Sequence, residues 1–221
     1  MSLPLPMFPL NTVLFPGVVV PLRVFEDRYR SLVHHLLREP DPTRRLFGSV
    51  AIREGYEVGE HGTQSLFRVG CRLQLTEVSP RADGSFDIEA VGRDRIRLDR
   101  LDTGGPFPQG EVAVLPTERR TVPRPVVEQA LAVFHAYRAA VTGLRADPLP
   151  ETLPRDPELL SWTLAAVAPL PLPERQSLLE TEDAELRLVL VTDLLRGELR
   201  TMNVLPSLPA TEVARTRWSP N

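Results

Sequence analysis

Histidine and cysteine are the residue types in this chain that could hold a metal ion or act as a nucleophile. The 221 residues include four histidines and one cysteine, Cys71. His34 and His35 are adjacent in a segment with helical periodicity, so their side chains point about 100° apart and do not chelate one ion together. His61 and His135 stand alone, and neither an HExxH nor a CxxC spacing occurs. We therefore predict no metal site.

Nucleophilic and cofactor-dependent chemistry is equally poorly supported by the residue pattern. Cys71 shares the inward side of a predicted strand with Leu73, which favours a small buried apolar role, because a reactive thiol needs a basic neighbour. The chain contains no GxSxG and no GxGxxG motif. Carboxylates at Asp83, Asp87 and Glu89 are typical of a turn and a solvated strand face. We predict no catalytic residues and no cofactor, and we do not expect an enzyme.

The absence of lysine excludes several further activities. All 26 basic residues are arginines. The chain therefore has no P-loop lysine to hold a nucleotide phosphate. It also has no lysine for a Schiff base or a Ser–Lys dyad.

Arginines gather in the middle of the sequence and form the candidate nucleic-acid site. Arg93, Arg95 and Arg97 are the alternative RNA-binding residues, with Arg95 and Arg97 expected on the polar face of one strand. Asp94 and Asp99 lie between and beside them, and the net charge is −3. This balance favours an intrachain ion-pair network over a basic binding face, so we do not expect nucleic acid to be the main partner.

Composition indicates an ordinary globular protein. Apolar residues make up 42% and charged residues 25% of the chain. No apolar run reaches the roughly 18 residues of a membrane span, and the N-terminus lacks the features of a signal peptide. A single cysteine cannot form an internal disulfide. We expect a cytoplasmic protein that does not contact a membrane.

The elements that would position a binding site begin with residues 7–37. An apolar strand is followed by a turn at Phe15-Pro16-Gly17, a second strand, and a helix from about Phe25 whose apolar face includes Tyr29. Phe8, Phe15, Phe25 and Tyr29 are core residues by default. The proline-rich edges beside them are expected to leave apolar surface open, which makes these four residues our candidate polypeptide-binding site.

The exact residues of this stretch carry more information than its periodicity. The order FPL, VLFPG, PL and FEDRY between Phe8 and Tyr29 closely resembles the opening of the Lon protease N-terminal, substrate-binding domain. The resemblance continues with Asp83-Gly84, with GRDRIRL from Gly92, and with a segment LPLPERQSLLE in the C-terminal half. It implies a stand-alone member of that family without the ATPase and peptidase modules.

The remaining sequence predicts two parts. Residues 46–52 and three or four later segments with a period of two predict short strands, joined by turns at Asp83-Gly84 and at Gly92-Arg93-Asp94. Helical periodicity takes over after about residue 119. We predict an α+β protein: a small PUA-like β-barrel with one packed helix in residues 1–118, and an α-helical bundle in residues 119–204. Residues 54–65 are expected to form a loop, and residues 205–221 a disordered tail.

The resemblance therefore implies a non-enzymatic module that binds unfolded or client polypeptides. Such a module could serve as an adaptor or holdase, alone or with a separate ATP-dependent protease. RNA binding by the PUA-like fold is the alternative, and a small-molecule site between the two parts is a third.

Overall fold

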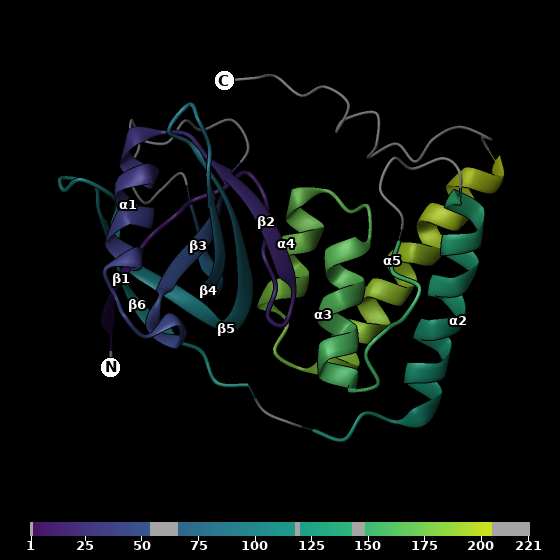
Figure 1. Ribbon diagram of the computed structural model, residues 1–221. Coiled ribbons are helices and arrows are strands. Elements are labelled where there is room, and N and C mark those ends of the chain that lie inside the picture. Colours follow the sequence, from purple (N-terminus) through teal and green to yellow (C-terminus); the bar gives the residue numbers. More distant parts are fainter. Residues whose placement is uncertain (1, 54–65, 118–119, 143–148, 205–221) are drawn as a thin grey trace. The chain divides into compact units, whose positions relative to one another are not determined.

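The chain forms two compact units, residues 1–117 and 118–221, in the computed structural model (Figure 1). The structure describes residues 2–53, 66–117, 120–142 and 149–204, so the predicted loop at 54–65 and the predicted disordered tail at 205–221 lie outside the described residues. The division into domains of residues 1–118 and 119–204 stays a prediction. The described elements are β1 (Leu3–Pro6), β2 (Val19–Val24), α1 (Asp27–Leu37), the short 3-10 helix η1 (Pro42–Arg44), β3 (Leu46–Ile52), β4 (Leu66–Pro80), β5 (Phe86–Asp102), β6 (Gln109–Val114), α2 (Arg124–Val141), α3 (Pro157–Val167), α4 (Leu172–Glu180) and α5 (Ala184–Val204).

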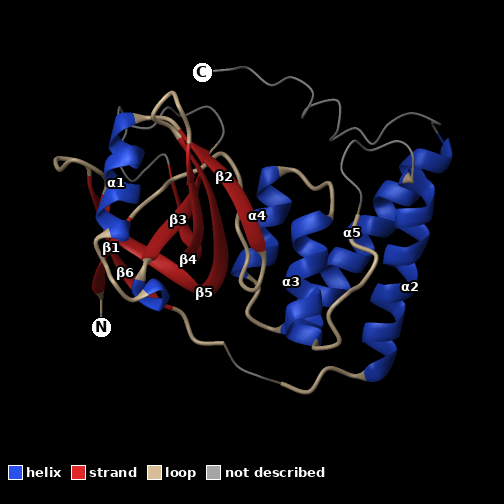
Figure 2. Ribbon diagram, viewed as in Figure 1, coloured by secondary structure: helices blue, strands red, loops and turns tan. Residues whose placement is uncertain are grey.

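The strands of the first unit form one antiparallel sheet, in the order β1-β6-β5-β4-β3, and β2 pairs with the first part of β5 (Figure 2). After β1, the chain runs parallel to β3. The Phe8 amide donates to the Gly48 carbonyl at 2.7 Å, and the Leu10 amide donates to the Val50 carbonyl at 3.1 Å. The predicted α+β class is confirmed. Complete closure into a PUA-like barrel stays a prediction.

Helix α1 packs its apolar stripe against this sheet. Tyr29, Leu32 and Leu36 are buried, as their helical spacing predicts, and they belong to one core cluster with Phe86 and Ile88 of β5. The helix begins at Asp27, later than predicted, so Phe25 lies outside its apolar stripe. This difference matters below, because Phe25 is then free of the core.

One predicted turn is wrong. Gly92-Arg93-Asp94 does not reverse the chain, because β5 continues through it from residue 86 to residue 102. The pairing with β4 shifts register there, which is the mark of a β-bulge. The reason for the glycine is a close approach: a Cβ at Gly92 would lie 2.1 Å from the carbonyl oxygen of Phe15. The other predicted turn is confirmed, since Gly84 adopts φ 78° between β4 and β5.

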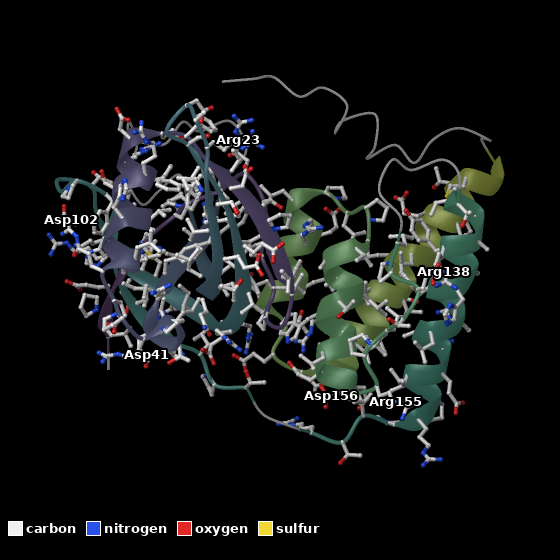
Figure 3. The ribbon with its side chains drawn as sticks, viewed as in Figure 1. Arg23, Asp41, Asp102, Arg138, Arg155 and Asp156 are labelled. Atoms are coloured by element: carbon white, nitrogen blue, oxygen red, sulfur yellow. The ribbon has the colours of Figure 1, made fainter. Side chains whose placement is uncertain are left out.

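The described elements of the second unit are the helices α2, α3, α4 and α5. Helix α5 packs against α2 and α3. Helix α3 has the predicted start, in which the Asp156 side chain accepts a hydrogen bond from the Leu159 amide at 2.9 Å and Pro157 occupies the first turn (Figure 3). In the core of the second unit, the side chain of Arg187 is fully buried beside the Trp162 ring.

Candidate functional site

Three of the four aromatic side chains predicted to bind polypeptide lie in the core of the first unit. Phe8 is 6%, Phe15 1% and Tyr29 3% exposed. The rings of Phe8 and Tyr29 stack with their centroids 4.1 Å apart, because α1 covers the sheet at this point. Phe25 is 56% exposed between β2 and α1. In this conformation, therefore, Phe25 alone among the four presents its side chain to a partner.

Exposed apolar side chains lie on the outer face of β2 and just after it at Phe25, with the exposed Arg23 between Pro21 and Phe25. Because side chains alternate along a strand, Val20 and Val24 pack toward the core while Val19 and Pro21 face outward. Val19 is 56% exposed, the same fraction as Phe25, and Pro21 between them is also exposed. We call Val19, Pro21 and Phe25 the β2 surface. Apolar side chains of this kind can be buried by an extended polypeptide.

The backbone of β2 adds hydrogen-bonding groups to this surface. Among the described strands, only β5 pairs with β2. The Val18 carbonyl accepts from the Gly92 amide at 3.0 Å. Since an antiparallel ladder alternates, Val20 directs its backbone groups at β5, and Val19 and Pro21 direct theirs away from it. Pro21 lacks an N–H and so costs no ladder bond at this position, which is the usual place for proline in a strand.

A groove of about 380 Å³ opens on the same outer face, across β2, β5 and β4. Two rows of directly opposed residues line it. One row is Pro21, Glu89 and Glu77, and the other is Arg23, Asp87 and Ser79.

The charges of this groove are unevenly matched. Arg23, labelled in Figure 3, donates to Asp83 at 3.1 Å. Arg81 donates to Asp87 at 2.5 Å. The carboxylates of Glu77 and Glu89 oppose each other across neighbouring strands, and neither takes part in a hydrogen bond or ion pair within the described part of the chain. The groove thus combines two matched pairs with a surplus of negative charge.

The three candidate RNA-binding arginines do not form one basic face. Arg95 is 1% exposed, because the chain leaving β6 covers it and the Pro116 carbonyl accepts its guanidinium at 3.1 Å. Arg95 is therefore not available on the exposed side of β5 that carries Arg97. Arg97 donates to Asp99 at 2.9 Å, which confirms the predicted ion pairing at this residue. Arg93 donates to the side-chain oxygen of Gln74.

Cys71 and Tyr29 are buried in the first unit, and neither is set up for acid–base or nucleophilic chemistry. Cys71 is fully buried, as predicted, and burial raises the pKa of its thiol to about 12. Burial likewise raises the pKa of the Tyr29 phenol to about 12. Both groups stay protonated at neutral pH, where a thiol is a poor nucleophile.

Within residues 2–53, 66–117, 120–142 and 149–204, no group of three or more histidine, cysteine, aspartate or glutamate side chains is arranged to hold a metal ion. No helix in those ranges has both the length and the apolar character needed to cross a bilayer.

Comparison with known families decides the relationship that the opening stretch suggests. The family model of the ATP-dependent protease La (LON) substrate-binding domain matches residues 4–197. This chain belongs to the Lon substrate-binding domain family. The predicted resemblance is thereby confirmed over nearly the whole length of the sequence.

Individual Lon-family relatives agree with this assignment. The Lon protease of Phenylobacterium zucineum is 28% identical over 96% of this chain, which corresponds to 26% of that protein. The chain spans about a quarter of the length of the curated relatives it matches first. Among solved structures, the Lon N-terminal domain protein from Xanthomonas campestris has a TM-score of 0.63 and 25% identity, covering 85% of this chain and 95% of that one. The N-terminal domain of Mycobacterium avium complex Lon protease shares the fold, with a TM-score of 0.60, 17% identity and coverage of 87% and 98%.

The β2 surface differs in composition from the site that sequence patterns suggest. Sequence reasoning favours the largest aromatic residues and overlooks Val19 and Pro21. Strand alternation from Val19 to Val24 contains the missing signal, since it turns every second residue outward. The opposed pair Glu77 and Glu89 is invisible to the sequence, because its register depends on a bulge in β4.

Proposed function

We propose that this Lon-family domain binds unfolded or extended polypeptides through the β2 surface. The observation that carries the proposal is the exposure of Val19 and Phe25, each 56%, along a strand whose outer backbone edge has no strand partner among the described residues. The family's description as a substrate-binding domain supports the same role here.

Binding would combine two ordinary interactions. An added strand exchanges backbone hydrogen bonds with the outward groups of β2, which is strand addition. Its side chains bury the apolar atoms of Val19, Pro21 and Phe25. Full burial of one valine or phenylalanine side chain contributes about 1.5–3 kcal/mol, so a few such contacts suffice for reversible capture. No cofactor and no covalent step is needed.

An adaptor or holdase role follows from capture without catalysis. The chain contains no lysine, so it offers neither a P-loop lysine nor a Ser–Lys dyad of its own. We propose that bound clients are protected from aggregation or are passed to a separate ATP-dependent protease. Both outcomes require that capture be reversible.

The test exploits the missing lysines. An amine-reactive dye labels only the N-terminal amine of this chain. The labelled protein is titrated with a permanently unfolded polypeptide, and its fluorescence anisotropy is recorded. A folded protein and single-stranded RNA serve as controls. We expect saturable, weakly salt-dependent binding of the unfolded polypeptide alone. Salt-sensitive binding of RNA without binding of polypeptide would overturn the proposal in favour of the RNA-binding alternative.

Variants of the β2 surface locate the binding. We expect Phe25→Ser to weaken binding by about tenfold and Val19→Thr by a few-fold, since each removes apolar area that the client would bury. Matched controls are Leu186→Ser on α5, 51% exposed, and Val114→Thr on β6, 39% exposed. Equal losses in the controls would show that binding does not depend on β2.

A further inference from the structure

We infer that the groove beside β2 takes a basic side chain of the bound polypeptide, an arginine or a lysine, that pairs with Glu89 and offsets its repulsion with Glu77. This inference rests on the proposed function, because the polypeptide must first lie along β2. It adds a chemical class of client: apolar extended segments that carry a positive charge at one register position.

The acidic pair is the first observation. Glu77 and Glu89 are directly opposed on antiparallel strands, and both are exposed. Side chains in that relationship have Cβ atoms about 5 Å apart, and like charges there destabilise the sheet. Arg23 of the groove already pairs with Asp83, and Arg81 already pairs with the groove carboxylate Asp87. A positively charged side chain of a bound polypeptide would therefore reduce the repulsion between the Glu77 and Glu89 carboxylates, which the described residues do not neutralise.

The position of the pair relative to β2 is the second observation. Pro21, Glu89 and Glu77 form one row across three strands, and the row starts at the edge of β2 that has no strand partner within the described ranges. Neighbouring strands lie about 4.8 Å apart, so a strand added at this edge would sit about 10 Å from Glu89. A residue opposite Pro21 on that strand reaches Glu89 only with a long side chain. Arginine and lysine have this reach, and their methylene groups can pack over the proline ring on the way.

The shape and charge of the groove then select among long side chains. A cavity of about 380 Å³ accommodates a side chain rather than a folded partner. A glutamate or glutamine would either add to the surplus negative charge or leave it unchanged. A guanidinium can bond two carboxylates at once, which makes arginine the better of the two basic occupants.

The experiment compares two fluorescent peptides of extended, alternating apolar sequence. They differ only at the central residue, which is arginine in one and citrulline, its neutral isostere, in the other. Anisotropy titrations use the full chain and a Glu77→Gln, Glu89→Gln double variant. Glu111→Gln with Glu128→Gln is the control, because it changes the net charge equally at exposed glutamates on β6 and α2. Circular dichroism checks that each variant is folded.

We expect the parent protein to bind the arginine peptide about fivefold more tightly than the citrulline peptide. This preference should disappear in the Glu77, Glu89 variant and persist in the control variant. The affinity for the citrulline peptide should be the same in all three proteins. Equal affinity of the parent for both peptides would overturn the inference while leaving polypeptide binding at β2 intact. A preference that survives the Glu77, Glu89 variant would also overturn it. Failure of both peptides to bind would overturn the proposed function itself.

Discussion

The guanidinium carbon of Arg187 lies 3.3 Å from the centroid of the Trp162 ring, inside the helical unit. The Arg187 side chain is fully buried, and it donates to Ser161 at 2.8 Å and to Glu158 at 2.6 Å. A buried charge is tolerated only when it is paired and hydrogen-bonded. This cluster therefore ties α5 to α3 by polar contacts at a point where most domains use apolar ones.

Removal of this arginine should be costly. We expect Arg187→Met to lower the free energy of unfolding by about 3 kcal/mol, because Glu158 and Ser161 lose their donor. Urea denaturation followed by circular dichroism measures the loss. Arg196→Met is the matched control: Arg196 pairs with Asp193 at 2.9 Å on the exposed face of α5. Arg196→Met should lower the free energy of unfolding by less than about 0.5 kcal/mol. Similar decreases in both variants would contradict the role assigned to Arg187.

Two glycines should respond to alanine in opposite ways. We expect Gly92→Ala to destabilise the protein by about 2–3 kcal/mol, since the new Cβ would meet the Phe15 carbonyl and the backbone would have to move. Gly197 lies within α5, and a Cβ there meets nothing within 4 Å. Gly197→Ala should stabilise the protein by about 0.5–1 kcal/mol, because alanine favours the helix. Thermal unfolding of the two variants distinguishes these signs directly.

The single thiol should be inert in the folded protein. Burial raises the pKa of Cys71 from 9.0 to about 12. The protonated thiol therefore stabilises the folded state below about pH 9, and this contribution to the free energy of unfolding is lost as pH rises toward about 12. At pH 8 we expect a disulfide reagent such as DTNB to react at least about a hundredfold more slowly with the native protein than with the protein in urea. Rapid reaction under native conditions would show that the core around Cys71 opens readily.

Acid should weaken the β4–β5 turn through Asp83. Hydrogen bonds from the Ser85 hydroxyl and amide, with a smaller contribution from Arg23, hold the pKa of Asp83 at about 2, below its ordinary 3.8. A depressed carboxyl pKa stabilises the folded state above about pH 4, and this contribution is lost as pH falls toward about 2. We expect the urea midpoint of the parent to fall more steeply over that range than that of Asp83→Asn. Parallel curves would exclude this contribution.

Most of the fold was accessible to sequence reasoning because it depends on local periodicity. The stripe of Tyr29, Leu32 and Leu36 predicts the packing of α1, and Asp83-Gly84 predicts its turn. The long β5 was not accessible, since glycine in a strand pattern resembles a turn unless the approach of Phe15 to Gly92 is known. Such an approach joins residues that are far apart in sequence.

The site was less accessible than the fold for a related reason. Exposure of an apolar residue depends on what the rest of the chain covers: Tyr29 of α1 packs on Phe8 and both are buried, while Phe25 before the helix stays exposed. Arg95 shows the same dependence with the opposite result, because its outward position on β5 is covered by the chain after β6. Alternation in the sequence predicts toward which side of the sheet a side chain points. Whether other segments cover that side chain depends on the folded chain.

Pro21 gives the edge of β2 one more property. An edge that accepts foreign strands is also a template on which a growing stack of strands, and ultimately an amyloid-like fibre, can begin. Because Pro21 offers a carbonyl but no N–H, every strand laid against β2 meets a missing bond in mid-edge. If two copies of this chain paired through this edge, each strand would lack the hydrogen bond that an N–H at position 21 would donate. Under the proposed function, Pro21 therefore favours reversible pairing with one bound polypeptide over continued stacking of strands.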